Sequence, residues 1–564
     1  MRRIVSAHWN LGVLLLILVL AGILRLAKLD QVPPGLHVDE AANAWNAYTL
    51  LKTGMDQHGV RWPVFYTRAF GENRSVSYVY ALLPFQALGG MNVWTTRLPS
   101  AVGGILTVLL IYFVGARLFG NNTGLVAAAM LAISPWHAQI SRLGLEASLS
   151  PLLIIGSLAV FLWADMPLAS DVERRPKPWA SALAGIVVAG ACYGYWALRL
   201  FLPLFFIGAA LLTWKGWWKH LKSRDGALSI GAMLIAGGVI FGPLFWMHLT
   251  DPEIGRRARI QGWVWSESDT PTEKIEKALS RYPGHFGIDF LFARGDRDPA
   301  YSLPEGTGLV HWYDLPLMLV GLVLLGLRCK ESPAARVVLW WVALYPIADL
   351  FNKAVGLHSL RSLPGVGALV LVAAVGAVGA GRWLWQRRRT TAPICYALIV
   401  LAVFLNVRFL RTFFGEEFYQ QKYYVTVYGA DMLEVAEWLK PRLKQVDAVF
   451  VRGTGVAHPY IFTLVGLSYD PEQWSRDVRE IVPGPMPDGA YHFEDVYLRY
   501  GKIHFMFGDS SAAALKQLKE NGRPDRVIFI VRPVEFELEK LVRPVYEVRD
   551  MEGRIVLQIF DAYL

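Results

Sequence analysis

Two adjacent carboxylates, Asp39 and Glu40, are the first residues of this chain that could do chemistry. They follow an almost entirely apolar segment, residues 11–24, and the pair Pro33-Pro34, which ends a helix and turns the chain. Helix capping is one explanation for them, because acidic residues favour the positive end of a helix. Carboxylates at the edge of a membrane are costly, however. We therefore interpret the pair as functional, with proton transfer as the chemistry that a carboxylate offers.

Basic and polar residues gather in three further stretches, at residues 135–142, 193–199 and 358–364. A single arginine at a membrane surface is explained by contact with lipid headgroups. Three such stretches and a carboxylate pair indicate more, because several arginine forks together can hold a lipid-linked phosphate at the bilayer surface. The candidate phosphate ligands are His137, Arg142, Arg199, His358 and Arg361.

A fourth stretch, residues 286–296, runs from an apolar half into the dipeptide Gly295-Asp296. The apolar half is typical of an interfacial helix or a re-entrant turn, and the Gly-Asp pair is typical of a turn. Packing against the first outer loop and contact with a substrate explain this stretch equally well. We take Asp296, together with Tyr195 of the second basic stretch, as candidates for substrate contact.

These residues are expected to lie on or between membrane-spanning helices. Hydrophobic residues make up 54% of the 564 residues and charged residues only 18%, a balance that is unusual for soluble proteins. The apolar residues form long blocks up to about residue 410 and thin out afterwards. At about 20 residues for each span, these blocks predict a multi-spanning α-helical membrane protein with about eleven transmembrane helices.

The basic residues between the apolar blocks predict the topology. The net charge of +10 could indicate nucleic-acid binding, but Lys and Arg cluster in loops at alternate ends of the spans, which the positive-inside rule explains better. With a cytoplasmic N-terminus, two long loops, residues 30–96 and 250–311, face outward. We therefore expect a membrane module, residues 1–410, in the cell's inner (plasma) membrane. An odd number of spans places residues 411–564 in an extracytoplasmic domain.

The region after residue 411 is predicted to be a small α/β domain. Helices are predicted at residues 432–444 and 510–520, and strands at residues 448–451, 526–531, 545–548 and 555–559. The region contains no GxGxxG sequence, P-loop or metal-ligand cluster. Its predicted role is therefore recognition or scaffolding.

With these residues assembled, the chain resembles a GT-C glycosyltransferase of the bacterial branch of the protein O-mannosyltransferase and lipid A aminoarabinose transferase superfamily. The resemblance covers roughly residues 10–410 and rests on an ordered series of short motifs on a matching topology. The motifs are Asp39-Glu40, Arg97-Leu98-Pro99-Ser100, Pro135-Trp136-His137, Ser141-Arg142, Phe290-Leu291-Phe292 with Gly295-Asp296, and residues 358–364. The C-terminal domain matches no motif of the family.

The resemblance implies transfer of a sugar from a polyprenyl-phosphate carrier to an acceptor hydroxyl on the outer face, with inversion at the anomeric carbon. It implies that Asp39 is the base that takes the hydroxyl proton, while Glu40 would orient the acceptor or the sugar. The leaving phosphate needs neutralising charge rather than an acid, and Arg199 and Arg361 are its first candidates. The weaker candidates are Arg142, His137 and His358.

No metal cofactor is assigned, because the outer loops offer no obvious carboxylate cluster, although a divalent cation could do the same work as the arginines. The expected partners are a polyprenyl-phosphate-linked sugar donor, membrane lipid and an acceptor. The sequence leaves the acceptor open between a secreted protein, a lipid and a cell-envelope polysaccharide.

The main alternative is a transporter or flippase for a polyprenyl lipid or a saccharide. It would explain polar residues in the membrane, but it predicts charges near the midplane and a repeat between the two halves. The charges lie mostly near the outer ends of the spans, and the sequence shows no convincing repeat. A receptor or scaffold anchored by the helices is a third reading, which needs far fewer than about eleven spans.

Overall fold

The computed structural model describes residues 2–168, 177–251, 263–266, 268–352, 356–415, 418, 427–452, 458–477, 479–482, 496–506, 526–532, 543–550 and 553–563. Contacts divide the chain into two compact units. The first combines Met1–Ala27 with Ser100–Phe413, and the second combines Lys28–Pro99 with Phe414–Leu564. The first of the two loops expected to face outward thus belongs to the same unit as the C-terminal region, an association that the sequence does not reveal.

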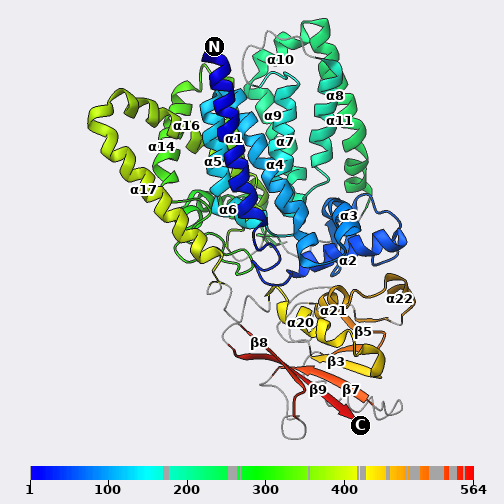
Figure 1. Ribbon diagram of the computed structural model, residues 1–564. Coiled ribbons are helices and arrows are strands. Elements are labelled where there is room, and N and C mark those ends of the chain that lie inside the picture. Colours follow the sequence, from blue (N-terminus) through cyan, green and yellow to red (C-terminus); the bar gives the residue numbers. More distant parts are fainter. Residues whose placement is uncertain are drawn as a thin grey trace. The chain divides into compact units, whose positions relative to one another are not determined.

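The first unit is helical (Figure 1). Its α-helices are α1 (Arg2–Leu26), α5 (Asn121–Ile133), α6 (Pro135–Ile140), α7 (Ser150–Trp163), α8 (Pro178–Ala191), α9 (Trp196–Leu212), α10 (Trp214–Leu221), α11 (Arg224–Thr250), α13 (Pro271–Ser280), α14 (Asp314–Arg328), α15 (Pro333–Leu344), α16 (Gly365–Gln386) and α17 (Arg388–Phe413). Shorter helical turns are η1 (Glu146–Leu149), η3 (Tyr282–Phe286), η4 (Asp289–Ala293) and η5 (Tyr345–Ala348). Helix α4 (Val93–Phe119) begins in the second unit and continues into the first.

Within the described residues, five helices are long and apolar enough to cross a membrane, or six if α9 and α10, which meet at 80°, form one span. Three further apolar helices, Asn121–Ile133, Pro178–Ala191 and Pro333–Ala348, are shorter. The predicted fold class, a helical multi-spanning membrane protein, is confirmed. The predicted number of about eleven spans is not confirmed by these helices.

Large apolar side chains cover the outer surface of these helices. Leu16 of α1 is 71% exposed and Ile235 of α11 is 70% exposed. Water would make such a surface unfavourable, whereas lipid chains solvate it. Between the helices, small residues allow close packing: a side chain on Gly185 of α8 would collide with the backbone carbonyl of Met233 on α11.

The second unit combines helices with two sheets (Figure 1). Its helices are α2 (Val38–Thr53), α3 (Ser77–Gly89), α20 (Ala430–Leu439), η6 (Leu443–Gln445), α21 (Pro459–Leu467) and α22 (Pro471–Arg476). A hairpin pairs β1 (Tyr66–Ala69) with β2 (Glu72–Ser75). The strands of the larger sheet are β3 (Ala448–Arg452), β4 (Arg479–Val482), β5 (Val496–Tyr500), β6 (Ile503–Met506), β7 (Arg526–Val531), β8 (Tyr546–Arg549) and β9 (Ile555–Tyr563).

The larger sheet has the strand order β4-β5-β6-β3-β7-β9-β8, with β3 parallel to both of its neighbours and β9 antiparallel to β7 and β8. Its strands β3, β7, β8 and β9 confirm the four strands predicted from the sequence, and α20 covers part of the predicted helix at residues 432–444. The helix predicted at residues 510–520 lies outside the described residues.

One hydrophobic core joins the N-terminal and C-terminal parts of the second unit. Leu36, Trp45 and Phe70 are buried together with residues of α20, α21 and the larger sheet. Gly35 has a φ of 72°, and a side chain on it would collide with the backbone carbonyl of Tyr428. That carbonyl accepts a hydrogen bond of 2.6 Å from the N–H of Leu36. Residues of the C-terminal part therefore support the segment that leads into α2.

Candidate active site

Glu40 forms a buried ion pair with Arg97. Its two carboxylate oxygens accept hydrogen bonds from Nε and Nη2 of Arg97 at 2.9 and 3.0 Å, and neither side chain is exposed. Arg97 also donates to three backbone carbonyls between residues 29 and 35. Glu40 accepts from the backbone N–H of His37 as well, which closes a capping box at the start of α2. Glu40 therefore fixes the segment before α2 and offers no exposed surface to a substrate.

Asp39, the adjacent carboxylate, is accessible. Its side chain is 23% exposed, and Oδ2 lies 2.8 Å from Nη1 of Arg74 on β2. Arg74 also lies 3.7 Å from the carboxylate of Glu72. Asp39 is in the first turn of α2, where the helix dipole favours a negative charge. The two carboxylates thus differ: one is enclosed by its partner, and the other is oriented by an arginine but can still meet a substrate.

A stack of side chains connects Arg74 to the C-terminal part of the second unit. The Arg74 guanidinium lies 5.2 Å from the ring centre of Phe70, and Phe70 stacks on His458 with ring centres 4.2 Å apart. His458 precedes α21 in a left-handed conformation with a φ of 57°, which is uncommon for residues other than glycine. Burial, with a contribution from Arg74, lowers the pKa of His458 to about 3, against an opposing effect of Asp39. A neutral imidazole is therefore within electrostatic reach of the Asp39–Arg74 pair.

Arg142 and His137, two of the predicted phosphate ligands, belong to a buried cluster with Arg25. Arg142 donates to the carbonyls of Leu24 and Ala27 at 3.0 and 2.8 Å. Arg25 donates to two carbonyls near the end of α5 and lies 2.7 Å from Nδ1 of His137. The last carbonyls of a helix need donors from outside the helix, and these arginines provide them. In this arrangement all three side chains are buried and act as structural contacts.

Arg199 lies in the first turn of α9. Its guanidinium stacks over the ring of Trp196 at 3.9 Å, and Nε donates to the carbonyl of Cys192 at 3.3 Å. Nη1 lies 3.3 Å from Nε2 of His248 on α11. The guanidinium is only partly buried, so its charge is accessible to an anionic ligand. Tyr195, a candidate for substrate contact, is the buried N-cap residue of the same helix.

His358 and Arg361 share one turn, which two buried carboxylates hold. Oδ2 of Asp296 accepts from the backbone N–H of Ser359 at 2.6 Å and lies 3.4 Å from Nδ1 of His358. Oδ2 of Asp349 accepts from the N–H of His358 at 3.0 Å, and Oδ1 lies 3.7 Å from Nη1 of Arg361. Burial raises the pKa of Asp296, although its hydrogen bonds from Ser359 act in the other direction. Asp296 thus holds the turn that carries Arg361.

Asp349 itself is fully buried and has two more basic neighbours. His285 Nε2 lies 3.1 Å and Arg281 Nη2 lies 3.7 Å from its Oδ2. Tyr345 donates to the backbone carbonyl of His285 at 2.5 Å, which fixes the residue that contacts Asp349. The turn of Arg361 is therefore held by Asp349, which side chains of η3 and η5 help to fix.

Sequence reasoning did not identify Arg74, His458, His285 or Asp349. Each is a single polar residue that lies far along the chain from a partner, so no local spacing marks it. Arg97 belongs to one of the motifs of the family resemblance, but its pairing with Glu40 was not expected.

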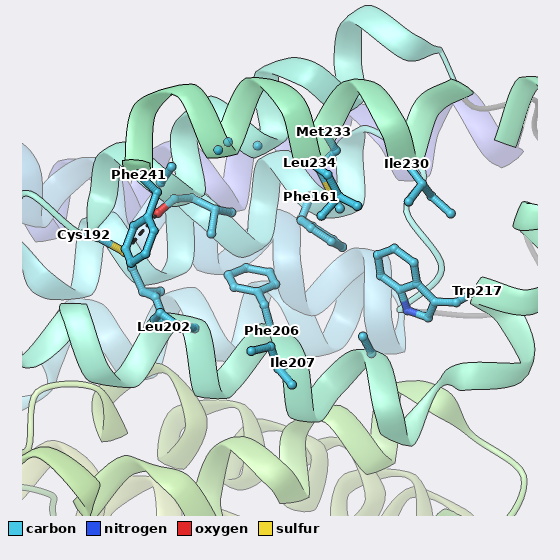
Figure 2. Close-up of a pocket in the computed structure, with 17 residues that line it drawn as sticks. Phe161, Cys192, Leu202, Phe206, Ile207, Trp217, Ile230, Met233, Leu234 and Phe241 are labelled. Carbon is cyan, nitrogen blue, oxygen red and sulfur yellow. Dashed lines mark hydrogen bonds between the residues drawn. The ribbon is translucent and has the colours of Figure 1, made fainter. Parts of the chain in front are cut away.

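The first unit also contains an apolar pocket of about 530 Å³ between α7, α8, α9 and α11, which Figure 2 shows. Its lining includes Phe161, Cys192, Leu202, Phe206, Trp217 and Phe241. The backbone carbonyl of Cys192 accepts the hydrogen bond from Arg199. One end of the pocket therefore adjoins a basic side chain that the sequence singled out.

Comparisons with known proteins give one family match and several structures of similar fold. The family model described as dolichyl-phosphate-mannose-protein mannosyltransferase matches residues 15–251, which include Asp39, Glu40 and Arg199. No curated protein matches the sequence. Among solved structures, ArnT from Cupriavidus metallidurans in the apo state has a TM-score of 0.52 and 13% identity, with 98% of each chain covered.

Two further structures are similar at lower TM-scores. ArnT from Cupriavidus metallidurans bound to undecaprenyl phosphate has a TM-score of 0.49 and 15% identity over 98% of each chain. The oligosaccharyltransferase AglB from Archaeoglobus fulgidus, in complex with an inhibitory peptide and a dolichol-phosphate, has a TM-score of 0.48 and 12% identity. That match covers 93% of this chain and 69% of AglB.

The family match covers the segment with the carboxylate pair, and the likeness to apo ArnT extends over nearly the whole chain at the level of the fold. Both confirm the class expected from the short motifs of the sequence. The chain has a GT-C fold, and residues 15–251 match a family of mannosyltransferases.

Proposed function

We propose that the chain transfers a sugar from a polyprenyl-phosphate donor to a hydroxyl of an acceptor at the extracytoplasmic face of the membrane. The observation that carries this proposal is the contrast between the two carboxylates: Glu40 is enclosed by Arg97, whereas Asp39 is accessible and oriented by Arg74. The matched family is named for a lipid-phosphate sugar donor and a protein acceptor, which supports a donor of this chemical class.

The proposed reaction is a direct displacement with inversion. The acceptor oxygen forms a bond to the anomeric carbon while Asp39 accepts the hydroxyl proton. The bond between that carbon and the phosphate oxygen breaks, and the polyprenyl phosphate leaves with the electron pair. The phosphate gains charge in this step, so cationic side chains that stabilise it lower the barrier.

Arg199 and Arg361 are the proposed phosphate ligands. Both guanidinium groups are partly exposed, whereas the guanidinium of Arg142 and the ring of His137 are buried in contacts with the protein. His358 shares its turn with Arg361 and supports it through Asp296 and Asp349. Within the described residues, no group of three or more metal-ligating side chains was found, and we assign no metal.

The topology of the proposal follows from the basic loops of the sequence. The N-terminus is cytoplasmic, the protein is a multi-pass protein of the inner membrane, and the C-terminal region is extracytoplasmic. The acceptor belongs to a class that carries a hydroxyl, which includes a secreted protein, a lipid and a cell-envelope polysaccharide.

Reconstitution in liposomes tests this function. We expect labelled sugar to reach an acceptor from a polyprenyl-phosphate donor, and no transfer from the corresponding nucleotide sugar. A labelled prenyl lipid that crosses the bilayer without forming any glycosylated product would contradict the proposal and favour a flippase. The sugar, which the structure does not specify, is varied in the donor series.

A further inference from the structure

Two links connect the C-terminal region of the second unit to the carboxylate pair. Tyr428 forms the first: its backbone carbonyl accepts from the N–H of Leu36, and its ring lies edge-on to His37 with ring centres 6.1 Å apart. His37 is the N-cap residue of α2, and its Nδ1 accepts from the backbone N–H of Asp39 at 3.2 Å. This link supports the backbone that carries Asp39.

The second link runs through side chains to the carboxylate itself. The ring of His458 stacks on Phe70 with an angle of 28° between the planes, and the guanidinium of Arg74 lies over the other partner of that stack, the Phe70 ring. Arg74 in turn contacts the carboxylate of Asp39 at 2.8 Å. His458, Phe70 and Arg74 are all buried, and closely packed side chains transmit a displacement to their neighbours. A shift of His458 would therefore reach the arginine that orients Asp39.

The ring of His458 acts by its shape rather than by its charge. Burial, with a smaller contribution from Arg74, lowers the pKa of His458 to about 3, so the imidazole is neutral at pH 7. The backbone of His458 has a φ of 57°, a conformation that histidine adopts more readily than most residues other than glycine. A flat, neutral ring is thus fixed against Phe70 and adds no charge beside the Asp39–Arg74 ion pair.

We infer that His458 is a positioning residue for the transfer reaction: its ring fixes Phe70 and, through Phe70, the arginine that orients the base. This role rests on the proposed function, in which Asp39 is the base. His458 itself takes no proton from the acceptor and touches no reacting atom. The C-terminal region, which matches no motif of the family, thereby contributes to catalysis as well as to the core of the second unit.

The variants His458→Ala and His458→Phe separate the effect of the ring from that of the backbone. Both place a residue other than glycine at the same positive φ and share that backbone cost, whereas only His458→Phe keeps a flat, neutral ring against Phe70. Trp474→Phe is the matched control. It removes a hydrogen bond of 3.0 Å from the indole to the carbonyl of Gln57, a contact that also joins the C-terminal region to the N-terminal part of the unit but involves neither Phe70 nor Arg74.

The experiment measures initial rates of sugar transfer by the full-length protein in liposomes. The donor is dolichyl-phosphate mannose, after which the matched family is named, and the acceptor is the one found in the liposome assay. For His458→Ala we expect kcat to fall about 10- to 100-fold with the KM for the donor within about threefold, because a misplaced base slows the chemical step more than donor binding. His458→Phe should reach a kcat within about threefold of the unsubstituted protein. Trp474→Phe should keep the full rate while its thermal midpoint falls.

A double-mutant cycle tests whether His458 acts through Arg74. Once Arg74→Gln has removed the arginine that orients Asp39, adding His458→Ala should lower kcat by no more than about twofold, whereas independent effects would multiply. If His458→Ala does not fold, Phe70→Leu interrupts the same stack from the hairpin segment with another apolar side chain, and the same loss of kcat is expected.

Full kcat in a folded His458→Ala variant, or in Phe70→Leu, would overturn the inference. So would an equal loss of kcat in His458→Ala and His458→Phe, or a loss in His458→Ala that multiplies with that of Arg74→Gln. Failure of the proposed function gives a different result: Asp39→Asn would transfer sugar at the full rate. If only the role of His458 fails, Asp39→Asn remains slow while folded His458→Ala is fast.

Discussion

Two pairs of arginines in the helical unit differ in what their guanidinium groups contact. Arg25 and Arg142 are fully buried, and they donate to carbonyls of α1 and α5 or just beyond their ends. Arg199 and Arg361 are partly exposed and lie beside a tryptophan ring or a buried carboxylate. An arginine at the edge of a membrane span can therefore complete the backbone hydrogen bonds of a helix or remain accessible to a ligand. Its position in the sequence does not separate the two roles.

The adjacent carboxylates repeat this contrast in the second unit. Glu40 is enclosed by Arg97, whereas Asp39 is accessible. Enclosed charges are expected to determine stability, and accessible charges are expected to determine activity. Substitutions at matched positions test this division.

Glu40→Gln is expected to have the largest effect. It leaves the buried guanidinium of Arg97 without its charge partner, which lowers the free energy of unfolding by about 3–5 kcal/mol. Asp39→Asn removes a partner of Arg74, whose side chain is buried, but Glu72 remains beside that arginine and Asp39 is partly exposed, so the cost should be smaller, about 1–3 kcal/mol. Thermal unfolding of both variants in detergent measures the difference in stability. Equal shifts of the midpoint would contradict the expectation that Glu40 contributes more to stability than Asp39.

Arg142→Ala should destabilise the helical unit. The carbonyls of Leu24 and Ala27 lose a charged donor, and each unsatisfied buried group costs about 1–3 kcal/mol. The Arg142→Ala protein that remains folded should bind the donor with the same affinity as the unsubstituted protein. A folded Arg142→Ala variant of normal stability that no longer binds polyprenyl phosphate would show that Arg142 is a ligand after all.

Arg199→Ala is expected to have the opposite effect to Arg142→Ala: weaker binding of the donor with little change in stability. Its loss removes a charge-assisted hydrogen bond to the phosphate, so the KM for the donor should rise about 10- to 100-fold. Stability should change little, because the guanidinium is not enclosed by carbonyls. Steady-state kinetics together with thermal unfolding check both parts, and an unchanged KM would place the phosphate elsewhere.

His458 should make the second unit sensitive to acid. Its pKa is lowered in the folded protein to about 3, so the unfolded chain takes up a proton near pH 6.5 that the folded chain does not. Stability is therefore fully present above pH 6.5 and falls by about 1.4 kcal/mol for each unit as the pH drops through the window from 6.5 to 3. Asp431, with its pKa raised by burial to about 6, acts in the opposite direction, so the effect is measured as a difference from His458→Asn. If the unsubstituted protein and His458→Asn gave parallel curves of stability against pH, His458 would not be the source of the acid sensitivity.

The sequence predicts the membrane module and the position of the carboxylate pair because both depend on local composition. Long apolar blocks predict spans, and short apolar runs predict the strands β3 and β7. The first helix ends at Leu26, earlier than the Pro33-Pro34 pair that was expected to end it. The difference in burial between Asp39 and Glu40 could not be predicted. It depends on Arg97 and Arg74, which folding brings to α2 from other elements.

The support of the arginines is likewise invisible in the sequence. Asp349 contacts His285 and lies beside Arg361, and these residues come from three separate segments of the chain. The C-terminal region matches no motif, yet its His458 stacks on Phe70 of the β1–β2 hairpin segment. Contacts of this kind follow from tertiary packing, which periodicity does not encode.

The central claim is that Asp39 accepts the proton of the acceptor hydroxyl. The most direct measurement is the transfer rate of Asp39→Asn at saturating donor, together with its donor affinity and its thermal stability. Loss of a general base predicts a rate lower by about 10²- to 10⁴-fold in the folded variant, with donor affinity nearly unchanged. A folded Asp39→Asn protein that transfers sugar at the full rate would contradict the account.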